Sequence, residues 1–390
     1  MASSSAPAKA DGSLHLSDRL SAAGLFAENY AQARERFRAL AQALGWEIES
    51  HALAARGPAG EELTIDVATH RPADPRRNGR CLIVSSGLHG VEAFLGSALQ
   101  CATMQHWIDR PATAPATRCV FLHALNPYGF AWLRRTDEAN IDLNRNFLLD
   151  SEPYRGSPRG YADLDRFLNP KCPPQRWDMF ALQAAARILQ VGLPALKATI
   201  AGGQFEFPQG LFYGGAQASQ TKRIVAESLS RWLGDSHRVT HIDLHSGLGK
   251  WGSYKLLVDY DLTIAQREQL AAWFGAAALE ENPAHANDPG VAYATRGGFG
   301  QWCMATQSER DYLFAYAEFG VYNILRTIAG LRAENQAHFW ANANDARTQC
   351  AKLRLKELLC PASPSWRENA VQQGVELIAR AADGSARIST

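Results

Sequence analysis

Residues 81–107, CLIVSSGLHGVEAFLGSALQCATMQHW, begin with an apolar strand pattern and continue into a helical pattern. The next apolar segment, RCVFLHAL (118–125), has the length and composition of a second strand. Strand, helix and strand in succession are the signature of a βαβ unit, and an apolar run such as CLIV is typical of a strand covered on both faces of its sheet. We therefore predict an α/β fold with helices on both faces of a central sheet.

Further elements follow the same two periodicities. Strand patterns cover 62–69, 239–246, 255–260 and 311–320, and helical patterns cover 28–44, 179–200, 219–233, 263–279, 321–339, 343–358 and 365–382. Between them lie an irregular stretch, GGQFEFPQGLFYGG (202–215), and a Gly-rich loop near 297–300. Long irregular loops in compact domains are more often functional than idle. No repeat or linker divides the chain, which predicts one catalytic domain over 16–390 after a disordered polar tail over 1–15.

The composition is that of a globular enzyme, with 46% hydrophobic residues, 20% charged residues and a formal net charge of +1. This balance gives no indication of a nucleic-acid or acidic-membrane partner. The seven cysteines are scattered, which argues against a thiolate metal site or a disulfide framework and favours a reducing compartment. No stretch approaches the ~18 apolar residues of a membrane span, and the first residues do not resemble a secretory signal. We expect a cytoplasmic protein.

His89 and Glu92 stand directly after the strand CLIVSSG, in the turn that leads into the following helix. The carboxyl ends of strands are where open α/β sheets bind their ligands. A spacing of three residues allows an imidazole nitrogen and a carboxylate oxygen to converge on one ion, and zinc readily accepts such mixed ligands. Taken alone, the pair is more often a surface histidine and a glutamate that stabilises a helix N-terminus.

A third ligand must come from elsewhere, and His245 is the best candidate. It ends the apolar strand VTHIDLHS just before Gly247, where the chain must turn, and Asp243 shares its face of the strand. His123 and His241 lie inside strands and are more often satisfied core histidines. Two histidines and one glutamate would leave one zinc position open for water.

The segment DLNRNF, which starts at Asp142, offers a carboxylate, an amide and a guanidinium within four residues. Asn144 and Arg145 are suited to gripping a substrate carboxylate, because arginine presents a bidentate fork and asparagine adds a donor. Asp142 could accept a hydrogen bond from the distal nitrogen of a metal-bound histidine and fix its tautomer. Upstream, Arg134 and Arg135 could polarise a scissile carbonyl. The competing interpretation is a polar turn with solvated arginines.

Glu318 follows the apolar run LFAYA (313–317) and is an unusual residue for the end of a buried strand. A carboxylate there carries a desolvation cost unless it is paired, bound to metal or used in chemistry. Burial raises the pKa of a carboxyl group, which suits a general base that removes a proton from water. A partly exposed strand-end glutamate is the simpler alternative when this residue is considered alone.

Taken in order, these segments resemble the zinc carboxypeptidase superfamily: His-x-x-Glu, Asn-Pro-x-Gly at 126–129, Asp-Leu-Asn-Arg-Asn-Phe, Asp-Leu-His-Ser and a late glutamate. More closely, the chain resembles a bacterial branch of that superfamily defined as a domain of unknown function. The segments that carry this resemblance are SSGLHGVEAFLGSA (85–98), LRRTDEANIDLNRNF (133–147), GGQFEFPQGLFYGG (202–215), IDLHSGLGKWG (242–252) and AEFGVY (317–322). The resemblance extends from about Glu28 to the C-terminus, and Ala93 stands where this branch would have glycine.

The resemblance implies a mixed, mainly parallel sheet flanked by helices, with one zinc ion per chain at the carboxyl ends of central strands. The implied roles are zinc ligand for His89, Glu92 and His245, carboxylate binding for Asn144 and Arg145, carbonyl polarisation for Arg135 or Arg134, and general base for Glu318. Arg135 is preferred because it lies nearer in sequence to Asp142. The substrate-capping tyrosine of the superfamily has two candidates, Tyr213 and Tyr293.

The leading hypothesis is a zinc-dependent, carboxypeptidase-like hydrolase that cleaves an amide bond next to a free carboxylate. An N-acyl amino-acid deacylase of the aspartoacylase type shares the same zinc ligands and Asn-Arg pair. An alternative of another class is a zinc- or peptide-binding module without catalysis, although the presence of both Arg145 and Glu318 speaks against it. The expected partner is a peptide or N-acyl amino acid with a free carboxylate, and the oligomeric state is left open.

Overall fold

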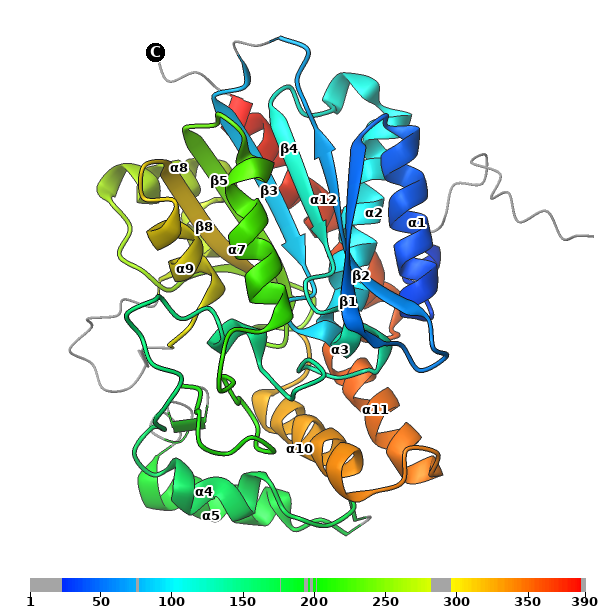
Figure 1. The fold of residues 1–390 in the computed structure, drawn as a ribbon, viewed down its shortest axis with the longest axis vertical. Helices are drawn as coiled ribbons and strands as arrows, with labels where there is room; N and C mark the ends of the chain where they lie inside the picture. The colour runs from blue at the N-terminus through cyan, green and yellow to red at the C-terminus, as the bar shows by residue number, and fades with distance from the viewer. Residues whose placement is uncertain are drawn as a thin grey trace, which may run out of the picture.

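A mixed β-sheet forms the centre of the protein in the computed structural model (Figure 1). The structure describes residues 23–74, 77–175, 177–192, 196, 199–200, 202–281 and 296–386. Its strands are β1 (Glu47–Arg56), β2 (Glu62–His70), β3 (Arg80–Ser86), β4 (Arg118–His123), β5 (Arg238–Ser246), β6 (Tyr254–Val258), β7 (Leu279–Glu281) and β8 (Asp311–Phe319). Their order within these ranges is β1-β2-β4-β3-β5-β8-β6-β7. Strands β4, β3, β5 and β8 run parallel, which confirms the predicted α/β fold with a mixed, mainly parallel sheet.

Helices cover both faces of this sheet. The α-helices are α1 (Tyr30–Ala43), α2 (Ala93–Asp109), α3 (Pro127–Ala131), α4 (Tyr161–Leu168), α5 (Phe180–Val191), α7 (Gln220–Leu233), α8 (Ile264–Phe274), α9 (Phe299–Thr306), α10 (Ile324–Trp340), α11 (Ala346–Leu359) and α12 (Pro364–Ala386). Short 3-10 helices are η1 (Ala23–Leu25), η3 (Gly90–Glu92), η4 (Pro111–Thr113), η5 (Leu143–Arg145) and η6 (Ala276–Ala278). Helices α2 and α12 pack on one face of the sheet with α1 outside α2, and α7 and α9 pack on the other (Figure 1).

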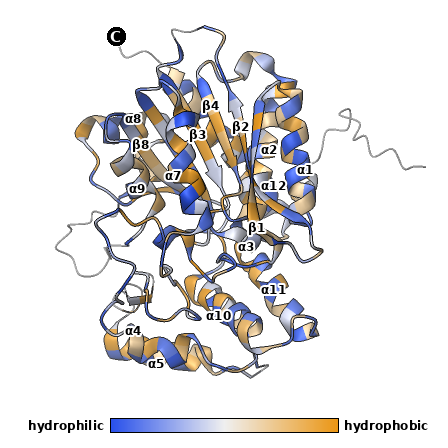
Figure 2. Ribbon diagram, in the orientation of Figure 1, coloured by the Kyte–Doolittle hydropathy of each residue, from blue (hydrophilic) through white to orange (hydrophobic). Residues whose placement is uncertain are grey.

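The central strands are apolar on both sides because each side faces a separate hydrophobic core. Along β3, Leu82 and Val84 belong to the core under α2, whereas Cys81 and Ile83 belong to the core under α7 and α9. Helix α2 is buried around most of its circumference because the sheet, α1 and α12 all contact it. Figure 2 shows the same contrast, with apolar colour along the central strands and polar colour on the outer surface of α1.

Several elements differ from the sequence prediction for local reasons. The edge strand β1 was not predicted, because its residues are mostly polar and partly exposed and show no clean alternation. Helix α9 starts at Phe299, inside the stretch predicted as a Gly-rich loop. Helix α8 ends at Phe274, because Gly275 adopts a positive φ of 85°. Helix α5 ends at Val191, and much of the chain up to residue 201 lies outside the described residues.

Three further predictions concerned membrane spans, the domain bounds and the cysteines. No helix in the described ranges is long and apolar enough to cross a membrane. The polar tail over 1–15 lies outside the described residues, and a single catalytic domain from residue 16 onward stays a prediction. Five of the seven cysteines are buried, and burial raises the pKa of the Cys81 thiol to about 12, as expected for an inert core thiol.

Candidate metal centre

The turn after β3 lies at a topological switch point of the sheet, where the strands that follow β3 in the chain lie on opposite sides of it. Strand β3 pairs with β4 on one side and β5 on the other, both in parallel. Such a switch point is where open α/β sheets form ligand crevices. Gly87 takes a positive φ of 68° to leave the strand, and a Cβ on Gly90 would lie 2.2 Å from the backbone of Gly129. The turn is therefore held close against α3, and it carries His89 and Glu92.

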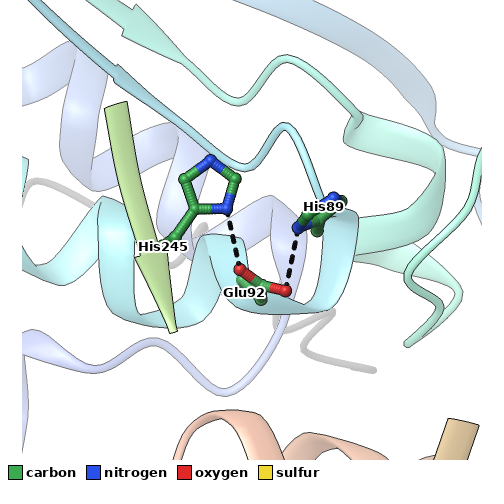
Figure 3. A group of neighbouring side chains, drawn as sticks. All are labelled: His89, Glu92 and His245. Atoms are coloured by element: carbon green, nitrogen blue, oxygen red, sulfur yellow. Dashed lines mark hydrogen bonds and ion pairs between the residues drawn. The ribbon is translucent and has the colours of Figure 1, made fainter. Parts of the chain in front are cut away.

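His89, Glu92 and His245 come together at the carboxyl ends of β3 and β5, as Figure 3 shows. His89 Nδ1 lies 3.0 Å from Glu92 Oε1, and His245 Nδ1 lies 3.2 Å from Glu92 Oε2. One ligand atom from each residue falls within 4.8 Å of the other two, and all three residues are buried. The structure thus brings together the three residues predicted as metal ligands.

The opposite nitrogen of each imidazole faces an aspartate. His89 Nε2 lies 3.2 Å from Asp142 Oδ1, and His245 Nε2 lies 2.5 Å from Asp243 Oδ2. An aspartate on Nε2 favours the tautomer that leaves a lone pair on Nδ1. Buried His89 Nδ1 makes no hydrogen bond, despite its closeness to Glu92. Zinc readily binds a donor set of two imidazole nitrogens and one carboxylate. Here the two imidazoles are also oriented by aspartates on their opposite nitrogens, so the residues fit this metal.

The carboxylates of the centre are held in their ionised form. Burial alone would raise the pKa of Asp142, but the Arg135 guanidinium and His89 hold it well below its usual range. Glu92 is likewise buried, and the charges of His89 and His245, together with the hydrogen bond of His245, hold its pKa below the ordinary value. The Ser246 backbone N–H also donates to Glu92 Oε2 at 3.0 Å. An ionised glutamate is the form that can bind a cation.

Arg135 and Arg134 are neighbours in sequence but face different surroundings. Arg135 donates from Nε to Asp142 Oδ2 at 2.9 Å and from Nη1 to Glu92 Oε1 at 3.3 Å. Its guanidinium also lies over the ring of Phe212, 5.3 Å from the centroid. Arg134 instead pairs with Glu334 on α10 at 2.9 Å and does not join the centre. The structure therefore separates two candidates that the sequence could not.

Asn144 and Arg145 lie on η5, which begins directly after Asp142. Asp142 connects them to the centre, because it contacts His89. Asp142 accepts a hydrogen bond from the backbone N–H of Asn144 at 3.1 Å. Asn144 Oδ1 accepts from the backbone N–H of Phe299 at 3.0 Å, which fixes the orientation of its amide. Arg145 is buried, and a Cβ on Gly203 would lie 2.5 Å from its Cδ. The loop 202–215 therefore packs against Arg145 at Gly203.

Glu318 lies on β8, opposite His245 of β5 in the parallel register. Its carboxylate is partly buried, and the backbone N–H of Leu248 donates to Oε2 at 3.4 Å. Burial raises the pKa of Glu318 to about 7, with a further contribution from the negative charge of Glu92. The residue is thus beside the centre and close to half ionised near neutral pH.

The structure assigns neither candidate for the capping tyrosine. Tyr213 is buried and belongs to a hydrophobic core cluster, and its capping role stays a prediction. Tyr293 lies outside the described residues. A different tyrosine reaches the site: the Tyr316 hydroxyl lies 3.3 Å from Asn144 Oδ1, and its ring contacts His245 edge to face.

Sequence reasoning missed Tyr316, and it placed Asp243 on the same strand face as His245 without giving it a role. Tyr316 could have been found by the same strand alternation, because it precedes Glu318 by two residues. Residues spaced in this way point to the same side of a strand. The role of Asp243 as the partner of His245 Nε2 follows only once this alternation is combined with the geometry.

The fold and the centre together define an α/β protein with a buried His-Glu-His candidate metal site. The chain belongs to the family described as "Protein of unknown function (DUF2817)", which matches residues 26–373. This membership confirms the resemblance drawn from the sequence. No curated protein matches the chain.

Solved structures with a similar fold include several carboxypeptidases. Carboxypeptidase A from Helicoverpa armigera has 14% identity and a TM-score of 0.46, over 89% of this chain and 77% of that chain. Bovine thrombin-activatable fibrinolysis inhibitor has 11% identity and a TM-score of 0.45, over 89% and 98%. A metallo-carboxypeptidase from Burkholderia cenocepacia has 10% identity and a TM-score of 0.43, over 91% and 68%. At such low similarity, activity must be inferred from the residues of the site.

Proposed function

We propose that the protein is a zinc-dependent hydrolase that cleaves an amide bond next to a free carboxylate, as a carboxypeptidase does. The observation that carries this proposal is the convergence of one ligand atom each from His89, Glu92 and His245 within 4.8 Å of one another. Each histidine is oriented from behind by an aspartate, and His89 Nδ1 has no hydrogen-bond partner without a cation. A buried set of this kind is suited to a metal ion.

His89, Glu92 and His245 would hold one zinc ion per chain. Three protein ligands leave a further position for water or substrate, which is typical of catalytic rather than structural zinc sites. The bound ion would supply Lewis acidity, which lowers the pKa of water and polarises a carbonyl oxygen. The protein supplies the remaining steps through Glu318, Arg135 and the Asn-Arg pair.

Glu318 is the proposed general base and general acid. Its carboxylate takes a proton from the attacking water while the water oxygen bonds to the carbonyl carbon. The protonated carboxyl then returns that proton to the leaving nitrogen as the carbon–nitrogen bond breaks. A pKa raised to about 7 suits both directions of transfer at neutral pH.

Arg135 is the proposed donor to the carbonyl oxygen as that oxygen gains negative charge. Its Nε bonds to Asp142 and its Nη1 reaches Glu92, so the guanidinium is held at the edge of the centre before substrate arrives. Its side chain retains 16% exposure, whereas the Arg134 side chain is almost fully buried against Glu334. Arg135 is therefore the arginine that substrate can reach.

Asn144 and Arg145 are the proposed anchors for the free carboxylate of the substrate. Asn144 Oδ1 accepts from Phe299 and faces Tyr316, which directs the donor end of the amide away from both residues. Arg145 lies on the same short helix, where its Nη1 donates to the backbone oxygen of Asn144 at 2.6 Å. Arginine is the side chain best suited to binding a carboxylate through several donors. This pair restricts the substrate class to compounds that carry a carboxylate next to the scissile amide.

The test is a comparison of three substrate sets with zinc-loaded protein: N-blocked dipeptides with a free carboxylate, the same dipeptides as C-terminal amides, and N-acetylated single amino acids. We expect release of the C-terminal amino acid from the first set and little from the amides, because the amides lack the free carboxylate that Arg145 would bind. Preferential hydrolysis of acetylated single amino acids would identify a deacylase instead. No hydrolysis of any set by protein that holds zinc would favour a binding module.

A further inference from the structure

A continuous line of hydrogen bonds runs from His245 into the core of the protein. His245 Nε2 lies 2.5 Å from Asp243 Oδ2, and the Ser85 hydroxyl donates to Asp243 Oδ1 at 2.6 Å. Ser85 Oγ lies 2.7 Å from His241 Nε2, and His241 Nδ1 lies 2.9 Å from the Tyr312 hydroxyl. All five residues are buried, with at most 5% of any one exposed.

The sheet register places these residues in contact across three neighbouring strands. His241, Asp243 and His245 alternate along β5 and therefore share one face. Ser85 of β3 stands opposite Asp243 in the parallel register, and Tyr312 comes from the start of β8. The line thus begins at the carboxyl end of the sheet, where the candidate metal centre lies, and extends towards the opposite end.

The donor and acceptor roles along this line follow from the contact between Ser85 and Asp243. The Ser85 hydroxyl donates to Asp243 Oδ1, because a carboxylate oxygen accepts hydrogen bonds. The single hydroxyl proton of Ser85 is then in use, which leaves its oxygen as an acceptor for His241 Nε2–H. Burial lowers the pKa of His241 to about 4, so the ring is neutral. Its Nδ1 then accepts from the Tyr312 hydroxyl.

We propose that Ser85, His241 and Tyr312 are positioning residues for His245. His241 and Tyr312 orient the Ser85 hydroxyl, whose hydrogen bond to Oδ1 fixes the Asp243 carboxylate. Oδ2 can then accept from His245 Nε2–H, so that the lone pair of His245 Nδ1 faces the candidate metal centre. Hydrogen bonds in such a dry setting are strong and mutually reinforcing, and here the rings of Phe299 and Phe314 enclose His241. The metal-binding part of this inference rests on the proposed function.

A second serine–histidine pair, formed by Ser97 on α2 and His123 on β4, supplies a matched control. Ser97 Oγ lies 2.8 Å from His123 Nε2, and burial lowers the pKa of His123 to about 4, as it does for His241. Both residues of this pair are buried. The His123 pair, however, makes no hydrogen bond among the described residues to the aspartates that face the histidine ligands, Asp142 and Asp243. Both serine-to-alanine variants therefore remove one buried hydroxyl that bonds to a buried histidine. Only Ser85 is also connected to His245, through Asp243.

The experiment measures the zinc dissociation constant of the wild type, Ser85→Ala and Ser97→Ala by competition with a chelating dye, and the cobalt(II) absorption spectrum of each. We expect Ser85→Ala to weaken zinc binding by about 10- to 100-fold and to alter the cobalt spectrum. Ser97→Ala should remain close to the wild type in both readouts. Equal zinc affinities and spectra for the two variants would overturn the proposal. If the wild type binds no zinc, the proposed function fails instead.

A second measurement does not depend on the metal and covers the case in which Ser85→Ala fails to fold. In metal-free protein with ¹⁵N-labelled histidine, ring-nitrogen chemical shifts distinguish protonated from unprotonated nitrogens. We expect His241 to be protonated at Nε2 and unprotonated at Nδ1, and Tyr312→Phe to shift the Nδ1 signal by removing its donor. A His241 ring protonated at Nδ1, or a Tyr312→Phe variant with an unchanged Nδ1 signal, would overturn the assigned line of donors.

Discussion

Two clusters of buried charge meet at the adjacent residues Arg134 and Arg135, and they are built in different ways. Arg134 points towards α10 and α11, where its Nε lies 2.9 Å from Glu334 and Lys352 lies 2.8 Å from the same carboxylate. Arg135 points towards the candidate metal centre, where it contacts Asp142 and Glu92. Both clusters are deeply buried.

The clusters differ in where their lone pairs point. In the first, the Glu334 carboxylate lies between Arg134 and Lys352, so opposite charges neutralise one another directly. In the second, two imidazole nitrogens and a carboxylate turn their acceptor atoms towards a common point, and aspartates hold the imidazoles from behind. Burial and charge are common to both. The convergence of acceptors is what distinguishes a candidate catalytic centre from a structural ion cluster.

The largest expected effect on activity comes from Glu318. The variant Glu318→Gln should keep its zinc content while kcat falls by about 10²- to 10⁴-fold, because an amide cannot exchange a proton with water or the leaving amine. Metal analysis and steady-state kinetics on the same sample check this outcome. The exposed strand residue Glu280 provides the matched control as Glu280→Gln. Retained hydrolysis in Glu318→Gln would remove Glu318 from the role of base.

The two neighbouring arginines provide the sharpest test of the comparison. Arg135→Met should lower kcat by about 10²- to 10³-fold, as expected for loss of a donor to the carbonyl oxygen. Arg134→Met should instead lower the free energy of unfolding by about 3 kcal/mol, while its folded fraction keeps near-normal kcat. Urea unfolding and kinetics on both variants measure the contrast. The reverse pattern would mean that the roles of the two arginines are exchanged.

The smallest expected effect is the pH dependence of the structural ion cluster. Burial would raise the pKa of Glu334, but Arg134 and Lys352 hold it below its unfolded value of 4.5. Its contribution to stability is therefore present above pH 4.5 and is lost as pH falls through the lower folded pKa. The wild type and Glu334→Gln should therefore differ less in their free energy of unfolding at acidic pH than at neutral pH. The difference should shrink by roughly 1 kcal/mol for each unit by which folding lowers the pKa of Glu334. A difference that is constant from pH 7 to pH 3 would contradict this.

The positions of His89, Glu92 and His245 could be predicted from sequence because they lie at the ends of apolar strands in the parallel part of the sheet. His89 and Glu92 lie in the turn after β3, and His245 is the second-last residue of β5. Strand-end position is a local signal, and parallel strands place their carboxyl ends along one edge. The fold class followed from the same segments.

Other features depend on contacts that no local pattern reveals. Arg134 and Arg135 are chemically identical neighbours, and their different roles depend on Glu334, which lies two hundred residues further along the chain. The line of hydrogen bonds from Tyr312 to His245 depends on the register in which β5 pairs with β3 and β8, because that register brings residues of the three strands into contact. Strand β1 is an edge strand with mostly polar residues, so it lacks the apolar alternation that predicts a strand.

The most direct test of the account is the zinc content of the wild type and of His245→Ala, measured by elemental mass spectrometry on folded, dialysed protein. We predict about one zinc ion per wild-type chain and near-complete loss in His245→Ala, because two remaining ligands bind zinc weakly. His123→Ala is the control and should retain the metal, since His123 bonds to Ser97 instead. Full zinc content in His245→Ala, or none in the wild type, would contradict the proposed centre.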